Sequence, residues 1–236
     1  MKIALCLHGK FDSITDSSSK GGDGYSHIRK RILSKCTPDV FIHSWDESEK
    51  DNILNLYDPV SYKFEKQIDF SPLTQHLKII PSPPRTPNTI LSHLYSVSES
   101  IRLSINHDDY DIIIKARFDL GRINRNTSGP HNANNPHPVQ CITFDPKLDM
   151  GLLHMANWQY LDSDGPADMW FYSSGKNMSH LKDLYSFALK CFDLNSSYAK
   201  SLNDLNDLPN AVKLYKAFYI EKELWRKKNL IDTIFD

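Results

Sequence analysis

The sequence lacks several patterns that would identify its function directly. Its four cysteines, Cys6, Cys36, Cys141 and Cys191, are scattered without the C-x-x-C spacing of a zinc site, which favours reduced thiols in a cytoplasmic compartment. No apolar run approaches the ~18 residues that a membrane helix requires. Neither a G-x-G-x-x-G fingerprint nor a P-loop spacing is present, so no common nucleotide-binding motif marks a phosphate site.

An excess of charge of one sign is also missing. The 236 residues carry a formal net charge of -1, with 24 % charged and 40 % hydrophobic residues. This balance disfavours both a disordered chain and a nucleic-acid partner, which would require a basic surface. The chain is long enough for one sizeable core and contains no internal repeat or linker, so we predict a single domain over 1–236.

The order of apolar segments predicts an α/β fold. A strand at 2–7, a helix at 25–35 and a strand at 40–45 form a β-α-β unit with parallel strands. Further along the chain we expect strands at 61–65, 111–119, 141–144 and 151–155, helices at 88–106, 176–192 and 209–228, and an exposed loop at 124–138. The prediction is a Rossmann-like domain with a mainly parallel central sheet, helices on both faces and a helical C-terminal end.

The most informative stretch runs from Tyr110 to Leu120, where an Ile-rich segment ends in two charged residues. The apolar run predicts a strand buried on both faces, and the carboxyl end of such a strand is where open α/β sheets bind ligands. Because side chains alternate along a strand, Lys115, Arg117 and Asp119 share one side. They form a candidate site for a phosphate or a metal-bound diphosphate, with a purely structural Arg–Asp pair as the alternative.

Two further candidates follow the first two strands. His8-Gly9 ends the first strand, and glycine allows a backbone to approach a ligand closely. Trp45 and Asp46 end the second strand, where the indole is a candidate for stacking on a base or sugar and the carboxylate for binding hydroxyls. Alternatively, Trp45 belongs to the core and Asp46 caps the following helical turn.

Asp168 opens an aromatic segment that runs to Ser174. A helix start at this position would make its carboxylate a cap. The functional alternative makes Asp168 a general base or a hydroxyl-binding carboxylate, with Trp158 or Trp170 as an apolar platform for a sugar.

Four motifs follow one another along the chain: Leu7-His8-Gly9, Asp39 to Asp46, Tyr110 to Leu120, and Asp168 to Ser174. The order resembles the small GT-A-type glycosyltransferases of bacterial surface-polysaccharide clusters and large DNA viruses. The resemblance implies a GT-A-like domain in which residues 1–120 form the nucleotide-binding half and 121–236 form the acceptor side and the C-terminal helices.

The resemblance also implies a set of roles. It assigns Asp168 as the catalytic base, Trp158 and Trp170 to acceptor binding, and His8, Gly9, Lys10, Trp45, Asp46, Lys115, Arg117 and Asp119 to the nucleotide-sugar donor. The acidic motif of that family, Asp-x-Asp, holds a divalent cation. Here Arg117 occupies the position of the first Asp, so Asp119 alone is left to coordinate Mn²⁺ or Mg²⁺. The guanidinium of Arg117 is suited to neutralise the diphosphate directly.

We therefore expect a glycosyltransferase, hexosyl or pentosyl, that acts on a glycan or lipid-linked acceptor. The alternatives are a non-catalytic nucleotide- or glycan-binding module, a nucleotidyltransferase-like or sugar-nucleotide-modifying enzyme that uses the same cation, and a glycoside hydrolase that uses Asp119 and Asp168. We expect a cytoplasmic protein, in the host cytoplasm if the source is viral, with at most peripheral membrane contact. The basic positions that suggest this contact are Lys222, Arg226, Lys227 and Lys228, and a solvated helix face is the alternative.

Overall fold

The computed structural model describes residues 1–11, 24–74, 86–121, 141–158, 161–162, 165–192 and 211–232. Seven strands of these residues form one sheet in the order β3-β2-β1-β4-β6-β5-β7. Their bounds are β1 Ile3–His8, β2 Asp39–Ser44, β3 Ser61–Phe64, β4 Ile112–Arg117, β5 Leu153–Ala156, β6 Trp170–Ser174 and β7 Lys228–Ile231. Among these strands β6 alone runs antiparallel to its neighbours, which confirms the predicted mainly parallel α/β sheet.

The sheet grows in two directions from β1. The chain first places β2 and then β3 on one side of β1, through α1 (Gly24–Ile28), a π-helical turn (Arg29–Leu33) and α2 (Lys50–Tyr57). The long helix α4 (Pro87–His107) then returns the chain to the other side of β1, where β4 pairs with it. The carboxyl ends of β1 and β4 therefore meet at a topological switch point, the usual ligand site of open α/β sheets.

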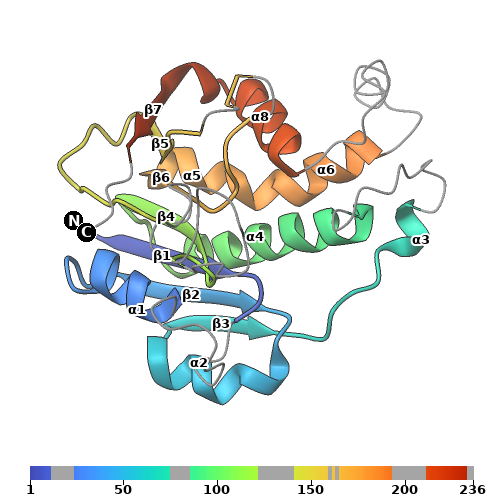
Figure 1. Ribbon diagram of the computed structural model, residues 1–236, viewed down its shortest axis with the longest axis horizontal. Coiled ribbons are helices and arrows are strands. Elements are labelled where there is room, and N and C mark those ends of the chain that lie inside the picture. Colours follow the sequence, from blue (N-terminus) through green and yellow to red (C-terminus); the bar gives the residue numbers. More distant parts are fainter. Residues whose placement is uncertain are drawn as a thin grey trace, which may run out of the picture.

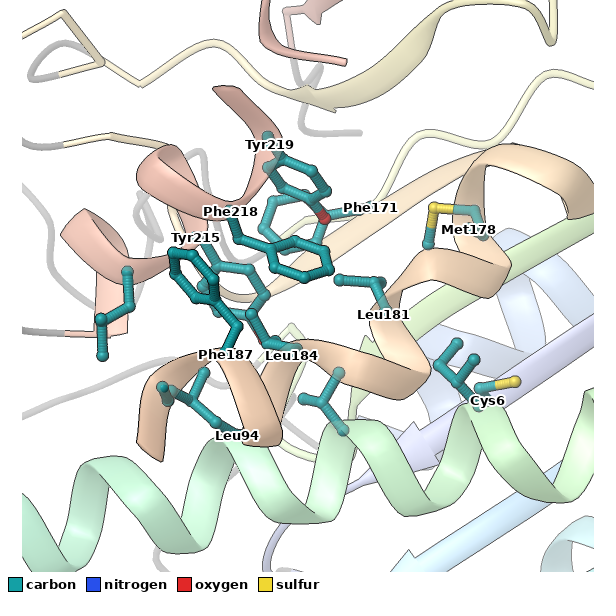
Figure 2. Close-up of a cluster of buried hydrophobic side chains, with 14 of the residues drawn as sticks. Cys6, Leu94, Phe171, Met178, Leu181, Leu184, Phe187, Tyr215, Phe218 and Tyr219 are labelled. Atoms are coloured by element: carbon teal, nitrogen blue, oxygen red, sulfur yellow. The ribbon is translucent and has the colours of Figure 1, made fainter. Parts of the chain in front are cut away.

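Helices cover both faces of the sheet (Figure 1). On one face α4 packs against the sheet, α6 (Leu184–Phe192) packs against α4, and α8 (Ala211–Glu221) packs against α6 and, through Tyr215 and Tyr219, on Phe171 of β6. Figure 2 shows Leu94, Leu184 and Phe218 from these three helices together. On the other face Ile28 of α1 and Ile53 of α2 pack on the sheet. This two-sided burial explains the continuous Ile run of β4.

Most of the expected elements are present, but the strand expected at 141–144 is not. Strands β1 to β5 and helix α4 match the expected segments at 2–7, 40–45, 61–65, 111–119, 151–155 and 88–106. Residues 141–144 form no ladder, although Ile142 and Phe144 are buried. The backbone N–H of Ile142 donates instead to Nε2 of His27 at 3.1 Å, so a side chain satisfies the group that a neighbouring strand would have used.

The C-terminal helices are shorter than expected. The helix expected at 176–192 consists of α5 (Gly175–Met178), a 3₁₀ turn (Ser179–Asp183) and α6. The helix expected at 209–228 ends at Glu221, where the φ of +56° at Glu223 takes the chain out of the helical conformation, and Lys228 already belongs to β7. The basic positions therefore do not share one helix face. The expected loop at 124–138 lies outside the described residues.

The remaining short elements complete the description. They are α3 (Ser71–Thr74) and 3₁₀ turns at Glu47–Glu49 and Trp225–Lys227. Cys6 and Cys191 are buried in the core, as free thiols. Within the part of the chain that the structure describes, no helix is both long and apolar enough to cross a membrane.

Candidate functional site

A pocket of about 450 Å³ lies at the carboxyl ends of the parallel strands, within the size range of small-molecule sites. Its walls come from the segments after β1, β2 and β3, the end of β4, the segment before β6, and helices α4 and α8. The lining residues are Gly9, Lys10, Trp45, Gln67, Thr89, Ile90, Ser92, His93, Ser96, Arg117, Asp168, Ala211 and Val212.

The order of the strands sets the order of the side chains across this pocket. Trp45 follows β2, Gly9 follows β1, Arg117 ends β4 and Asp168 precedes β6, and these four strands are neighbours in that order. Because β6 runs antiparallel to β4, its beginning lies at the edge where β4 ends, and the N–H of Arg117 donates to the carbonyl of Met169 there. The pocket therefore has an aromatic end at β2 and a charged end at β4 and β6.

A buried hydrogen-bonded histidine supports the aromatic end. The half-buried Trp45 ring stacks on Tyr95, with 5.3 Å between ring centroids, and meets His43 edge-on at 4.8 Å. Nε2 of His43 lies 2.9 Å from a carboxylate oxygen of Glu65, and Nδ1 lies 2.7 Å from Oγ of Ser96. Burial lowers the pKa of His43. A neutral ring that donates from Nε2 to the carboxylate and accepts from Ser96 satisfies both contacts.

Arg117 dominates the charged end. Its Nε and Nη2 donate to the two carboxylate oxygens of Asp119 at 2.8 and 2.6 Å, while Nη1 lies 3.7 Å from Oδ2 of Asp168. Burial opposes the charge of Arg117, but the two carboxylates outweigh burial and raise its pKa above the ordinary value. One permanent cation therefore bridges two carboxylates on the pocket wall.

Asp168 is held from several directions. The buried ammonium of Lys115 donates to its main-chain carbonyl, and Nε2 of His93 lies 3.5 Å from its Oδ2. Burial raises the pKa of Asp168, whereas His93, Arg117 and Lys115 lower it, and the net result is a pKa below the ordinary value. Asp168 is thus an ionised carboxylate at pH 7. It precedes a strand, so the alternative role as a helix cap is wrong.

His93 is a pocket residue that the sequence analysis did not identify. Its Nε2 lies 3.1 Å from the hydroxyl of Tyr215, and its ring contacts His8. Burial lowers the pKa of His93 to about 3, although Asp168 raises it, so the ring is neutral at pH 7. The sequence does contain a pattern that indicates this residue. Polar residues at helical spacing form one stripe on α4, which faces the pocket: Thr89, Ser92, His93 and Ser96.

The structure brings five of the expected site residues together in the pocket wall, namely Gly9, Lys10, Trp45, Arg117 and Asp168. The expectation that His8 and Lys115 meet the donor is wrong for this structure, because both side chains are fully buried behind the wall. Asp46 and Asp119 do not line the pocket either. Asp119 is held by Arg117, and Asp46 accepts a hydrogen bond from the Ser48 hydroxyl.

The two tryptophans expected at the acceptor lie away from the pocket. Trp170 is fully buried in the core on the α1 side of the sheet, where it stacks with Tyr172, and so it cannot present a platform to a sugar. Period-two alternation explains this, because Trp170 pairs with Ala116, whose side chain faces that core, whereas Lys115 lies over Phe171 in the core on the other face. Trp158 packs against both cores and does not line the pocket.

The described residues do not form a metal site around Asp119. Both of its carboxylate oxygens accept hydrogen bonds from Arg117, and the described chain contains no group of three His, Cys, Asp or Glu side chains that could hold a metal ion. The expected Mn²⁺ or Mg²⁺ stays a prediction. The cations in the described pocket wall are the ammonium of Lys10 and the guanidinium of Arg117.

The chain is similar in structure to a known glycosyltransferase. A glycosyltransferase involved in the glycosylation of the major capsid of PBCV-1 is similar over 98 % of this chain and 82 % of its own, with 13 % identity and a TM-score of 0.41. No protein-family model matches the chain, and no curated protein matches it.

Proposed function

We propose that this chain is a glycosyltransferase that moves a sugar from a nucleoside-diphosphate sugar to a hydroxyl of a glycan or lipid-linked acceptor. The observation that carries the proposal is one pocket at the switch point of the sheet. An aromatic ring, a permanent cation and an ionised carboxylate follow one another across it as Trp45, Arg117 and Asp168. A nucleotide sugar presents the matching series of a flat base, a diphosphate and a reacting sugar carbon.

In this proposal each part of the donor has its own residues. The base stacks at Trp45, whose ring is fixed by Tyr95 and His43. The diphosphate lies at the Gly9 backbone, Lys10 and Arg117. Gly9 suits a close approach, because its φ is +102° and no atom lies within 4 Å of the position that a Cβ would take.

The reaction then needs one proton acceptor and one stabiliser of the leaving group. Asp168 takes the proton of the acceptor hydroxyl, the freed oxygen bonds to the anomeric carbon, and the bond from that carbon to the diphosphate oxygen breaks. The nucleoside diphosphate leaves with the bonding electrons. Arg117 stabilises the charge that develops on it, because a fixed cation in a partly dry site requires no reorganisation.

The arrangement of Arg117 also weighs against the hydrolase alternative. A two-carboxylate hydrolase needs both acids free to act on the glycosidic bond. Here both oxygens of Asp119 are occupied by Arg117, and Asp119 does not line the pocket. A non-catalytic binding module would share the pocket but would not turn the donor over.

The experiment is a thermal-shift screen with UDP-, GDP-, CMP- and TDP-sugars, each with manganese and with EDTA. A ligand at 100 times its dissociation constant stabilises the fold by about 2.7 kcal/mol. We expect one nucleotide class to raise the melting temperature, with a smaller effect in Trp45→Ala. The EDTA samples test the metal prediction separately. No shift with any donor would contradict the proposal, and binding without turnover would favour the module.

A further inference from the structure

Lys115 is the residue whose placement needs an explanation beyond packing. It lies in the middle of β4, and its side chain is fully buried. Its ammonium donates to the main-chain carbonyl of Asp168 and lies over the rings of Phe171 and Tyr215, at 4.8 and 5.3 Å from their centroids. Among the described residues it forms no direct ion pair with a carboxylate, so its near contacts are a carbonyl and two ring faces, and the carboxylates of Asp168 and Asp119 favour its charge from farther away.

Stability does not account for a lysine at this position. An isolated buried cation costs several kcal/mol, and a methionine of similar length would avoid that cost. The cost is visible in the pKa of Lys115, which burial lowers to about 7. A charged group kept in the core at such a cost is a functional-site candidate.

The contacts of Lys115 connect it to the reacting end of the pocket. The carbonyl that it holds belongs to Asp168, at the point where the chain enters β6. The carboxylate of the same residue is then directed between His93 and Arg117, at 3.5 and 3.7 Å. Lys115 itself does not line the pocket, so it acts through Asp168 rather than on a ligand.

We propose that Lys115 is a positioning residue. It fixes the main chain of Asp168 and offsets the charge of its carboxylate, so that this group is held at the pocket wall in its ionised form. The inference rests on the proposed function, since it assigns a role to the residue that supports the proposed proton acceptor. It separates the cation that meets the leaving group, Arg117, from the cation that organises the base.

The test compares Lys115→Met with the wild type in three measurements. We expect kcat to fall roughly 10- to 100-fold, since a misplaced catalytic group has effects of that size, with the KM for the donor within about twofold. The melting temperature should stay equal or rise, which a structural role would not allow. Lys115→Arg, which keeps a cation and a donor, should recover part of kcat.

The matched control is Lys228→Met. Lys228 also lies on a strand of this sheet with its ammonium over an aromatic ring, Trp225 at 4.6 Å, but it begins the edge strand β7 and does not line the pocket. We expect this variant to keep both kcat and KM. A comparable loss of kcat in Lys228→Met would show that the effect at Lys115 is general and would overturn the inference.

A measurement without a donor separates this inference from the proposed function. Because Lys115 lowers the pKa of the Asp168 carboxyl, that pKa, followed by NMR, should rise in Lys115→Met. A wild type that turns over no donor would refute the proposed function and leave this comparison to decide the link between the two residues. An unchanged pKa of Asp168, an unchanged kcat, or a Lys115→Met protein that does not fold would each overturn the inference.

Discussion

At the scale of single residues, Arg117 sets the electrostatics of the pocket. A lone guanidinium bridges Asp119 and Asp168 and still forms part of the wall. Asp119 neutralises it through a bidentate pair, which fixes the plane of the guanidinium, and the Asp168 contact is longer. The bidentate pair therefore holds the guanidinium in a fixed orientation at the pocket wall.

Replacement of Arg117 should affect both binding and stability. In Arg117→Gln we expect donor affinity to fall at least about tenfold and the free energy of unfolding to fall by about 1–3 kcal/mol, because Asp119 and Asp168 lose their partner. Calorimetric titration and urea denaturation measure the two effects. Arg102→Gln is the control, since Arg102 pairs with Glu99 away from the pocket and such exposed pairs contribute about 0–1 kcal/mol. Unchanged donor affinity in Arg117→Gln would contradict the assignment.

Lys115 should also make the free energy of unfolding depend on pH. Its pKa is about 7 in the folded protein and 10.5 ordinarily, so between pH 7 and pH 9 the unfolded chain binds a proton that the folded chain does not. Stability should then rise with pH in the wild type relative to Lys115→Met, by at most about 1.4 kcal/mol per pH unit. Urea denaturation of both proteins at pH 7, 8 and 9 measures the difference. If the free energy of unfolding changes equally with pH in the wild type and in Lys115→Met, the environment of Lys115 does not disfavour its charged form.

At the scale of elements, the sequence predicts a helix or strand correctly where the apolar pattern within that one segment is sufficient. The Ile run of β4 and the apolar spacing of α4 are predicted at their observed places within one or two residues. The strand expected at 141–144 is absent from the structure. The backbone N–H of Ile142 donates to the side chain of His27 and not to a neighbouring strand, and no local sequence pattern reveals this contact. Local patterns do not bring Asp168 to Arg117 and His93, because this meeting depends on the long-range antiparallel pairing of β6 with β4; the family resemblance placed Asp168 and Arg117 in one site but not His93.

The contact between α8 and the segment before Asp168 offers a test at this scale. Gly165 has a φ of +115°, and a Cβ there would lie 2.5 Å from the carbonyl oxygen of Val212. In Gly165→Ala we expect α8 to be displaced and stability to fall by about 2 kcal/mol or more, from backbone strain together with the clash. Gly9→Ala is the matched comparison, with a similar φ but open space, and should cost less. Equal melting temperatures for the two variants would contradict close packing of α8 on Gly165.

At the scale of the whole molecule, buried neutral histidines link stability to acid. The pKa values of His8, His27, His43, His93 and His154 are all lowered, with burial as the largest cause. A histidine whose folded pKa is below its unfolded pKa binds more protons in the unfolded chain over the range between the two values. Stability should therefore be lost as the pH falls from about 6.5 towards 4.

The acid dependence can be measured by urea denaturation at pH 7, 6, 5 and 4. We expect the midpoint to fall steadily across this range, and His93→Gln to show a shallower fall because one buried site no longer has to charge. A midpoint that is constant or rises between pH 7 and pH 5 would show that these rings are accessible to protons in the folded state.

The central claim is that the pocket transfers a sugar with Asp168 as proton acceptor, and the most direct measurement is nucleoside-diphosphate release. The assay offers the donor found by thermal shift together with a panel of glycan acceptors to the wild type and to Asp168→Asn. We predict acceptor-dependent release by the wild type, and a loss of roughly 10²- to 10⁴-fold in Asp168→Asn with donor binding retained. Release by Asp168→Asn at the wild-type rate, or no acceptor-dependent release by a wild type that binds the donor, would contradict the claim.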